Sequence, residues 1–402
     1  MINKVTELKL KVRNKGYSGE VSRKLLKELV SLNGRIGFRG YTKNDIVERS
    51  NGVLTYSPTN IVNNKIVNYK NDTYISQDKY KESPEIMVKN NDILFVKTGS
   101  TLGKSALVRN LTEPATINPQ LIVIKTIHVD SDYLAVYLLT DSIQKQVFQV
   151  KIGGAVPTLT ETEIGKFVVK LPPLPEQTAI GSLFRTLDDL LASYKDNLTN
   201  YQSLKVTMLS KMFPKVGQTV PEIRLDGFEG EWENKILSEV TNITMGQSPK
   251  SENYTDNPND YILVQGNADI KDKQVVPRLW TTEVTKMAEI GDIILTVRAP
   301  VGDIGKTDYN VVIGRGVAAI KGNDFIFYTL EKMKMTGFWN KFSTGSTFES
   351  ISSNDIKEAI IQIPTLEEQK AIGAYFSNLD NLIVAHQEKI SQLETLKKKL
   401  LQ

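Results

Sequence analysis

The sequence of 402 residues has no cysteine and only two histidines, His128 and His386. Without cysteine the chain cannot form disulfide bonds, Cys-based zinc sites or a thiol nucleophile, and two histidines argue against a His-rich metal site. The sequence also lacks an apolar run of 18 residues and a secretory pattern at its start. We therefore expect a soluble cytoplasmic protein that has no metal site and no membrane partner.

Positive charge is concentrated near the N-terminus, although the whole chain is only mildly basic, with a net charge of +4. Residues 1–43 carry eleven Lys and Arg against three acids, Glu7, Glu20 and Glu28. This excess indicates a polyanion partner, and it makes Arg35 and Arg39 candidate contacts. A solvated basic tail would give the same local charge.

An internal repeat divides the chain. The segment LPPLPEQ at 171–177 returns as IPTLEEQ at 363–369, an offset of 192 residues. Residues 171–210 placed on 363–402 without a gap give 14 identities in 40 pairs. Unrelated sequences would give roughly two or three. The chain is therefore a duplicated pair of modules.

Each repeat contains a long segment whose apolar residues are spaced alternately four and three apart, which is typical of a coiled coil. A helix of about 36 residues would be roughly 55 Å long. Two such helices in one chain predict antiparallel packing between modules related by a two-fold axis; the alternative is two helices buried in separate cores. The residues expected at the helix–helix and subunit interface are Ile180, Phe184, Leu187, Leu191, Leu198, Tyr201, Ile372, Phe376, Leu379, Ile383, Ile390 and Leu393.

The segments that precede the helices contain short strand-like runs separated by Gly, Asn and Pro turns, including 120–125, 166–170, 261–264 and 317–320. They predict an α+β protein: two mixed α/β globular domains joined by the two long helices, with a pseudo-two-fold repeat. The expected ranges are 1–171 for the first domain, 172–213 for the central helix, 214–221 for a linker, 222–363 for the second domain and 364–402 for the C-terminal helix.

Residues 95–105, FVKTGSTLGKS, end like a nucleotide-binding P-loop. A P-loop also needs a glycine five residues before its Gly-Lys pair, and that position is Thr98. The corresponding loop at 299–307, APVGDIGKT, has Pro300 there, and proline has no N–H to donate to a phosphate. Both loops therefore argue against a nucleotide site.

Both loops follow a strand that ends in a basic residue, Lys97 or Arg298, and both carry a later lysine, which suits the phosphates and base edges of DNA. A hairpin whose glycines only satisfy turn geometry is the alternative. The candidate DNA-binding residues are Arg35, Arg39, Lys97, Ser100, Lys104, Arg109, Gln120, Gln247, Lys250, Arg298, Lys306 and Arg315.

No catalytic constellation is visible. Asn118-Pro119-Gln120 lacks the second proline and the aromatic residue of an adenine methyltransferase tetrad. Glu368-Gln369-Lys370 has the letters of a nuclease E-x-K element but opens a helix, where a glutamate already favours the positive end of the helix dipole.

The repeated L-P-P-L-P-E-Q-x-A-I and I-P-T-L-E-E-Q-x-A-I segments resemble the specificity (S) subunits of type I restriction–modification systems. The junction at 221–228, PEIRLDGF, and the following Trp232 are similar to the same family, whereas the first half shows no obvious counterpart of this junction. The resemblance covers nearly the whole chain.

The resemblance implies two target-recognition domains that each read one half of a bipartite site in double-stranded DNA, with the helices setting the spacer. It implies two methylation subunits that carry S-adenosylmethionine and restriction subunits that use ATP and Mg, while this chain binds no cofactor and is no enzyme by itself. The competing class is an adaptor whose globules bind proteins instead of DNA, and a stand-alone nuclease or methyltransferase is a third. Residue types do not reveal the half-site sequences or the spacer length.

Overall fold

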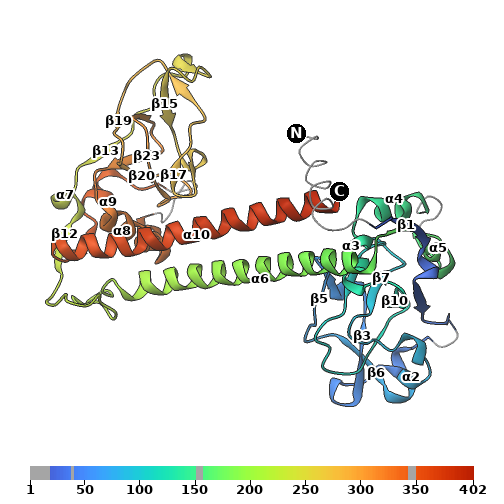
Figure 1. Ribbon diagram of the computed structural model, residues 1–402. Coiled ribbons are helices and arrows are strands. Elements are labelled where there is room, and N and C mark those ends of the chain that lie inside the picture. The colour runs from blue at the N-terminus through green and yellow to red at the C-terminus, as the bar shows by residue number, and fades with distance from the viewer. Residues whose placement is uncertain (1–18, 38–39, 151–156, 343–349) are drawn as a thin grey trace. The chain divides into compact units, whose positions relative to one another are not determined.

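The computed structural model describes residues 19–37, 40–150, 157–342 and 350–402 (Figure 1). The chain divides into two compact units, residues 1–194 with 389–402, and residues 195–388. The boundaries differ from the domain ranges expected from the sequence, because each unit combines one globular domain with a stretch of both long helices. No helix in the described part of the chain is long and apolar enough to cross a membrane.

The first unit is built on a four-stranded sheet in the order β2-β10-β7-β8 and a three-stranded sheet in the order β6-β3-β9. Two strand pairs, β1-β11 and β4-β5, complete it. Its strands are β1 (Ser22–Leu25), β2 (Val30–Gly34), β3 (Gly52–Tyr56), β4 (Ile61–Val62), β5 (Lys65–Ile66), β6 (Thr73–Ser76), β7 (Ile93–Val96), β8 (Ser105–Leu107), β9 (Ala115–Ile117), β10 (Leu121–Thr126) and β11 (Val168–Leu171). Its short helices are α2 (Gln77–Lys81), α3 (Ser131–Leu138), α4 (Asp141–Val150) and α5 (Glu161–Gly165).

Strand β7 explains the apolar run that follows Asp92. Side chains of successive strand residues point to opposite faces of a sheet. Ile93 and Phe95 lie in one buried cluster with α3, whereas Leu94 and Val96 lie in a second cluster with β3 and β9. The strand is apolar throughout because both of its faces are covered.

The second unit has a six-stranded sheet in the order β13-β23-β20-β21-β17-β16, a five-stranded sheet in the order β14-β18-β15-β22-β19 and the pair β12-β24. Its strands are β12 (Glu233–Ile236), β13 (Ile243–Met245), β14 (Tyr254–Thr255), β15 (Tyr261–Val264), β16 (Ile270–Lys271), β17 (Gln274–Val275), β18 (Trp280–Thr281), β19 (Met287–Ala288), β20 (Ile293–Thr296), β21 (Ile304–Lys306), β22 (Val311–Ile313), β23 (Val317–Ile320) and β24 (Ile360–Ile363). Its short helices are α7 (Leu237–Val240), α8 (Asp324–Met335) and α9 (Ser353–Lys357).

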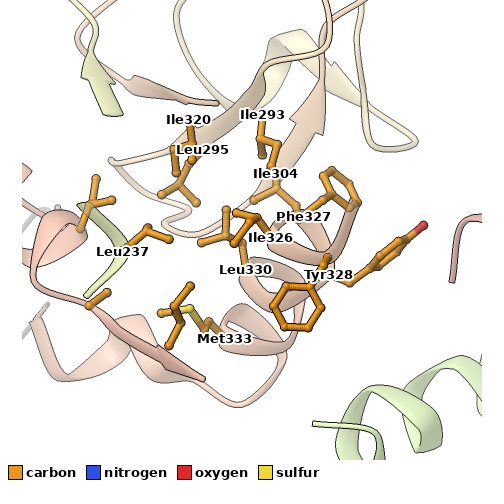
Figure 2. Close-up of a cluster of buried hydrophobic side chains, with 14 of the residues drawn as sticks. Leu237, Ile293, Leu295, Ile304, Ile320, Ile326, Phe327, Tyr328, Leu330 and Met333 are labelled. Carbon is orange, nitrogen blue, oxygen red and sulfur yellow. The ribbon is translucent and has the colours of Figure 1, made fainter. Parts of the chain in front are cut away.

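Strand β20 is buried on both faces, as β7 is. Ile293 and Leu295 face a buried cluster formed with α8, and Ile294 faces the opposite cluster. Figure 2 shows the first of these clusters, in which Ile326 and Leu330 of α8 lie against the sheet residues. The second domain is therefore a mixed α/β domain of the same design, as the sequence predicts.

The two long helices are α6 (Leu174–Lys211) and α10 (Leu366–Leu401). None of the residues expected at their seam is exposed. In the second unit, Tyr201 of α6 packs edge-to-face on His386 of α10, and Lys205 contacts Asp380. Residue numbers rise along one helix as they fall along the other, so the predicted antiparallel pairing is confirmed in this unit.

The seam is shorter than the sequence predicts, because the first turns of each helix pack on a globular domain. Ile180 packs against the first-domain core, and Ile372 and Phe376 belong to the second-domain core. The helix–helix contact proper in the first unit is formed by Leu187, Leu191 and Leu393. An apolar heptad position records only that a side chain is covered, not whether a helix or a sheet covers it.

Arg224 of the PEIRLDGF junction links this segment to the start of α10 through an ion pair. Its Nε and Nη2 donate to the two carboxylate oxygens of Glu368, at 2.8 and 2.7 Å, and its Nη1 and Nη2 also donate to the carbonyls of Gly230 and Glu229. The Glu368 side chain is only 1% exposed. Two separate family-like motifs of the sequence thus form one buried, bidentate ion pair.

Candidate nucleic-acid interface

The loop after β7 is a folded hairpin in which four backbone amides already donate hydrogen bonds. The N–H of Gly99 donates to Pro157 O, that of Leu102 to Gly99 O, and that of Gly103 to Val96 O. The Lys104 N–H donates to Thr101 O. These four amides are not free to bind a phosphate, so the side chains of this loop are the better candidates for a DNA contact.

Strand register corrects the alignment of the two loops. Lys97 N–H donates to Gln120 O and its carbonyl accepts from Leu159; Val297 makes the same two bonds, with Gly316 and Ile351. Val297, and not Arg298, is therefore the counterpart of Lys97. The sequence comparison matched Lys97 with Arg298 by their charge, which does not record strand pairing. The second hairpin is also one residue shorter than the first.

The Gly-Lys pairs are not equivalent either. Gly103 donates to Val96 O and Gly302 donates to Thr296 O, and both glycines have a positive φ, of 89° and 87°. Gly305 and Lys306 lie instead within β21. Lys306 forms an ion pair with Asp324 and is held over the ring of Phe327, so its charge is neutralised inside the domain.

Three of the expected DNA-binding residues meet in one cleft of about 500 Å³ in the second unit. Lys250 lies on the loop after β13, Arg298 on the loop after β20 and Arg315 between β22 and β23, and all three are exposed. The other lining residues are polar or small, and none is acidic: Ser248, Pro249, Ser251, Tyr254, Gln265, Gly266, Asn267, Ala299 and Gly316. Lys250 lies 3.7 Å from Glu252, which is outside the lining. A concave surface lined by three cations and no carboxylate attracts a polyanion. Gln247 is exposed and lies next to the cleft in the chain.

The cleft contains polar residues that sequence reasoning missed. Gln265 and Asn267 follow β15, and Tyr254 is the first residue of β14. The Nε2 atom of Gln265 is buried and has no hydrogen-bond partner among the described residues. In the sequence these residues stand out only by lying in or next to a short strand, a position that many residues without a binding role share.

The candidates of the first unit are more scattered. Arg35 is 5% exposed, and its Nε donates to Ile117 O at 3.0 Å, so it supports the domain interior and has no exposed guanidinium to offer DNA. Lys97 is ion-paired with Glu161 at 2.8 Å, and Arg109 with Asp132. Ser100, Lys104 and Gln120 are exposed. Arg39 lies outside the described residues.

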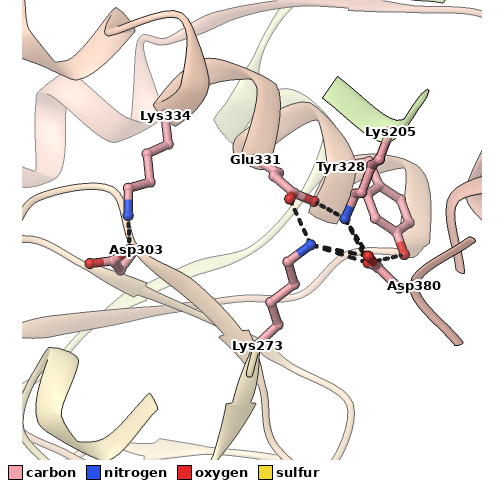
Figure 3. Close-up of polar contacts among 7 residues, drawn as sticks. All are labelled: Lys205, Lys273, Asp303, Tyr328, Glu331, Lys334 and Asp380. Atoms are coloured by element: carbon pink, nitrogen blue, oxygen red, sulfur yellow. Dashed lines mark hydrogen bonds and ion pairs between the residues drawn. The ribbon is translucent and has the colours of Figure 1, made fainter. Parts of the chain in front are cut away.

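A charged cluster ties the helix pair of the second unit to its globular domain (Figure 3). Lys205 of α6 lies 2.6 Å from Asp380 of α10 and 2.9 Å from Glu331 of α8. Lys273, at the tip of the β16–β17 turn, lies 2.6 Å from Glu331 and 3.2 Å from Asp380. The Tyr328 hydroxyl donates to Asp380 at 3.0 Å. Two cations and two anions therefore balance in a largely buried site.

The cluster perturbs its own ionisable groups. Burial lowers the pKa of Lys205 against the attraction of Glu331. Burial also acts to lower the pKa of Lys273, but the carboxylates of Glu331 and Asp380 outweigh it and raise that pKa. Burial and the charge of Asp380 raise the pKa of the Tyr328 hydroxyl. A cleft of about 640 Å³ adjoins the cluster and is lined by Lys205, Lys273, Tyr328 and Asp380. The charged groups at this cleft pair with one another, as in a structural ion-pair network.

The first unit contains the same helix contact in a simpler form. Lys397 of α10 pairs with Asp188 of α6. Lys397 and Asp380 are the repeat copies of Lys205 and Asp188, each 192 residues later. The two ion pairs are therefore repeats of the same contact, with the lysine on α6 in the second unit and on α10 in the first. The first unit thus has the same antiparallel register. The described residues contain no group of three or more acids or histidines that could hold a metal ion.

Comparisons with known proteins agree with this architecture. The family model for the type I restriction modification DNA specificity domain matches twice, at residues 24–202 and 229–395. A protein assigned as the type I restriction enzyme MjaX specificity subunit of Methanocaldococcus jannaschii is 28% identical over 344 residues, which cover 82% of this chain and 80% of that one.

Solved structures show the same arrangement of elements. One comes from a study of complex assembly and conformational transition of the type I R-M system. It is 25% identical, has a TM-score of 0.56, and the match covers 96% of this chain and 98% of that one. The HsdS subunit from Thermoanaerobacter tengcongensis, 23% identical with a TM-score of 0.53 and 98% of its length covered by 97% of this chain, supports the fold alone. With two specificity domains, two long helices and an antiparallel helix contact repeated in both halves, the chain belongs to the family of type I restriction–modification specificity subunits.

Proposed function

We propose that this chain reads a bipartite site in double-stranded DNA, with one half-site bound by each globular domain, and that it is not itself an enzyme. Its family supports sequence recognition in general. The observation that carries the proposal is the cleft of the second unit, whose lining contains Lys250, Arg298 and Arg315 and no carboxylate. Lysine and arginine on adjacent loops suit phosphates and base edges together.

A salt titration of DNA binding tests this role against the adaptor alternative. Affinity for duplex DNA should fall linearly with the logarithm of salt concentration, because each phosphate contact releases counterions. Lys250→Ala should reduce the magnitude of that slope by about one phosphate contact, and Lys321→Ala, outside the cleft lining, serves as the control. Absence of salt-dependent DNA binding would favour an adaptor whose globules bind proteins.

We further propose that the helices set the spacing between the half-sites. The support is the ion pair of Lys205 with Asp380 and its copy, Lys397 with Asp188, which require one antiparallel register. Lengthening α6 alone would break one of these pairs. A heptad inserted between residues 196 and 197 and a second between residues 388 and 389 keeps both, because each insertion lies midway between the paired positions.

The double insertion should lengthen the preferred spacer by about three base pairs. Seven helical residues add about 10.5 Å at 1.5 Å per residue, and DNA rises 3.4 Å per base pair. Mapping the methylated sites of cells that express the variant measures the spacer. Insertion in α6 alone is the control, and it should weaken binding instead of shifting the spacer. An unchanged spacer with the double insertion would contradict the ruler role.

Exposed leucines at matched positions support docking of two methylation subunits, with restriction subunits joining them. Leu190 and Leu396 lie in the first unit, Leu204 and Leu382 in the second, and each is at least 37% exposed. Leu382 and Leu396 are the repeat copies of Leu190 and Leu204, so each unit carries one of each kind. We propose that S-adenosylmethionine, ATP and Mg bind those partners. Leu204→Asp with Leu382→Asp should cost one methylation subunit of two in a native mass measurement, and retention of both would contradict this surface.

A further inference from the structure

We infer that Arg298 and Arg315 read guanine in the half-site bound by the second domain, and that the first domain has no such pair. The inference rests on the proposed function and names the base that the cleft of the second unit selects.

Both guanidinium groups are available to a ligand. Neither has an ion-pair or hydrogen-bond partner for its side chain within the described part of the chain; the only polar contact of Arg315 is its backbone N–H, which donates to Ser248 Oγ at 3.1 Å. Both line the same cleft and both are exposed. A free, planar guanidinium at a DNA-facing surface presents two parallel donors.

The other two arginines of the second unit are paired with acids, which sets Arg298 and Arg315 apart. Arg224 binds both carboxylate oxygens of Glu368, and Arg278 lies 3.6 Å from Asp269. The cleft lining contains no acid. Two unneutralised arginines in one cleft indicate a ligand that supplies the acceptors.

Guanine is the base that fits this chemistry. In the major groove it offers O6 and N7, two acceptors at the spacing of an arginine fork, whereas adenine and cytosine each present a donor there. Two unpaired guanidinium groups in a cleft whose lining has no carboxylate favour a base edge rich in acceptors.

The first domain carries other residues at the matching positions. Arg298 follows Val297, whose counterpart is Lys97, so the counterpart of Arg298 is Thr98. Gly316 O and Gln120 O accept the matching bonds, so the counterpart of Arg315 is Pro119. Threonine and proline have no guanidinium, which confines this mode of guanine reading to the second half-site.

Selection of random duplexes by the full-length chain, alone and with its methylation partners, tests the inference. We expect the wild type to enrich a two-part motif with guanine in one half. Arg298→Lys with Arg315→Lys keeps both charges but removes the forks, so the guanine preference in that half should fall about tenfold or more while the other half and the salt dependence stay unchanged. Lys321→Ala is the control and should leave the motif intact.

Substitution of 7-deazaguanine at the enriched positions removes N7 and provides a second readout. It should weaken wild-type binding about tenfold and leave binding of the double lysine variant unchanged. Equal weakening of all sequences by the variant, with the guanine preference kept, would show phosphate contacts; that overturns guanine reading and leaves the proposed function standing. If the wild type enriches no motif in either form, the proposed function fails, and the inference with it.

Discussion

Lys205→Met tests whether the charged cluster of the second unit holds α6, α10 and α8 together. The variant removes one cation from a set of two lysines and two carboxylates whose charges cancel. Asp380 then retains only Lys273, at 3.2 Å, and the Tyr328 hydroxyl. The Lys205 side chain is 7% exposed, so water cannot readily replace it.

The expected cost follows from the burial of the partners. Removing one member of a buried ion pair costs about 3–5 kcal/mol, because the remaining charge stays desolvated and uncompensated. Lys273 remains within reach of both carboxylates, which are 19% and 24% exposed, and this lowers the expected loss to about 2–4 kcal/mol. Lys205→Met with Asp380→Asn should cost less than Lys205→Met alone, since Lys273 and Glu331 then balance each other.

Tryptophan fluorescence during urea unfolding measures the effect in the right unit. All three tryptophans, Trp232, Trp280 and Trp339, lie within residues 195–388. Lys397→Met is the matched control: it removes the copy of Lys205 in the first unit, where the pair is more exposed, at 19% and 33%. Its cost should be about 1 kcal/mol or less, and it should not move the tryptophan transition.

Two results would refute this reasoning. If Lys205→Met changes the tryptophan-detected free energy of unfolding by less than about 0.5 kcal/mol, the cluster does not stabilise the second unit. If the double variant is no more stable than Lys205→Met, the loss comes from packing of the lysine stem and not from the unpaired carboxylate.

Three further predictions concern single contacts. Arg224→Ala should lower the free energy of unfolding of the second unit, measured by tryptophan fluorescence, by about 3–5 kcal/mol, because it leaves the buried Glu368 carboxylate without its ion-pair partner. Arg224→Lys should recover only part of this loss, since lysine cannot bind both carboxylate oxygens and two carbonyls. Equal stability of the two variants would contradict this. Gly302→Ala should lower the free energy of unfolding more than Gly291→Ala in the same assay. Both glycines have a positive φ, which costs alanine about 1–2 kcal/mol. Only at Gly302 would the new Cβ also lie 2.6 Å from the Trp339 ring. Glu161→Gln should destabilise the first unit by less than about 1 kcal/mol near neutral pH, measured by circular dichroism. Burial acts to raise the pKa of Glu161, but the hydrogen bond from Lys97, a backbone hydrogen bond and the charge of Lys97 together outweigh it, so the folded pKa lies below 4.5. The stabilisation is present above that value and is lost as pH falls through the folded pKa. A variant difference that persists in acid would contradict the pair.

Repeats and heptads were readable because they depend on periodicity, which a sequence records directly. The seam positions, the strands after Asp92 and Asp292 and the two-domain plan all follow from spacing. The comparison of the two loops failed for the opposite reason. Gly103-Lys104 and Gly305-Lys306 match in letters, but the first pair lies in the loop before β8, whereas the second pair lies within β21.

One sequence signal became legible only with strand pairing. Ser22 pairs with Leu171 as Glu233 pairs with Ile363, which fixes an offset of 211 residues between the starts of the domains. At that offset the run Arg13 to Glu20, RNKGYSGE, matches 224–231, RLDGFEGE. The first half does carry a counterpart of the junction, and the expectation that it lacks one is wrong. The absent proline and the replacement of Trp232 by Val21 had hidden it.

The sequence by itself determined the duplication, the length of the helices and the class of the protein, because these are properties of local pattern and of repeated residues. Only the tertiary structure decided which cations are available to a ligand. Arg35, Lys97 and Lys306 resemble Arg298 and Arg315 as letters, yet burial or a neighbouring carboxylate occupies the first three. The difference depends on the loops and helices that fold around each side chain, and residues distant in the chain supply those neighbours.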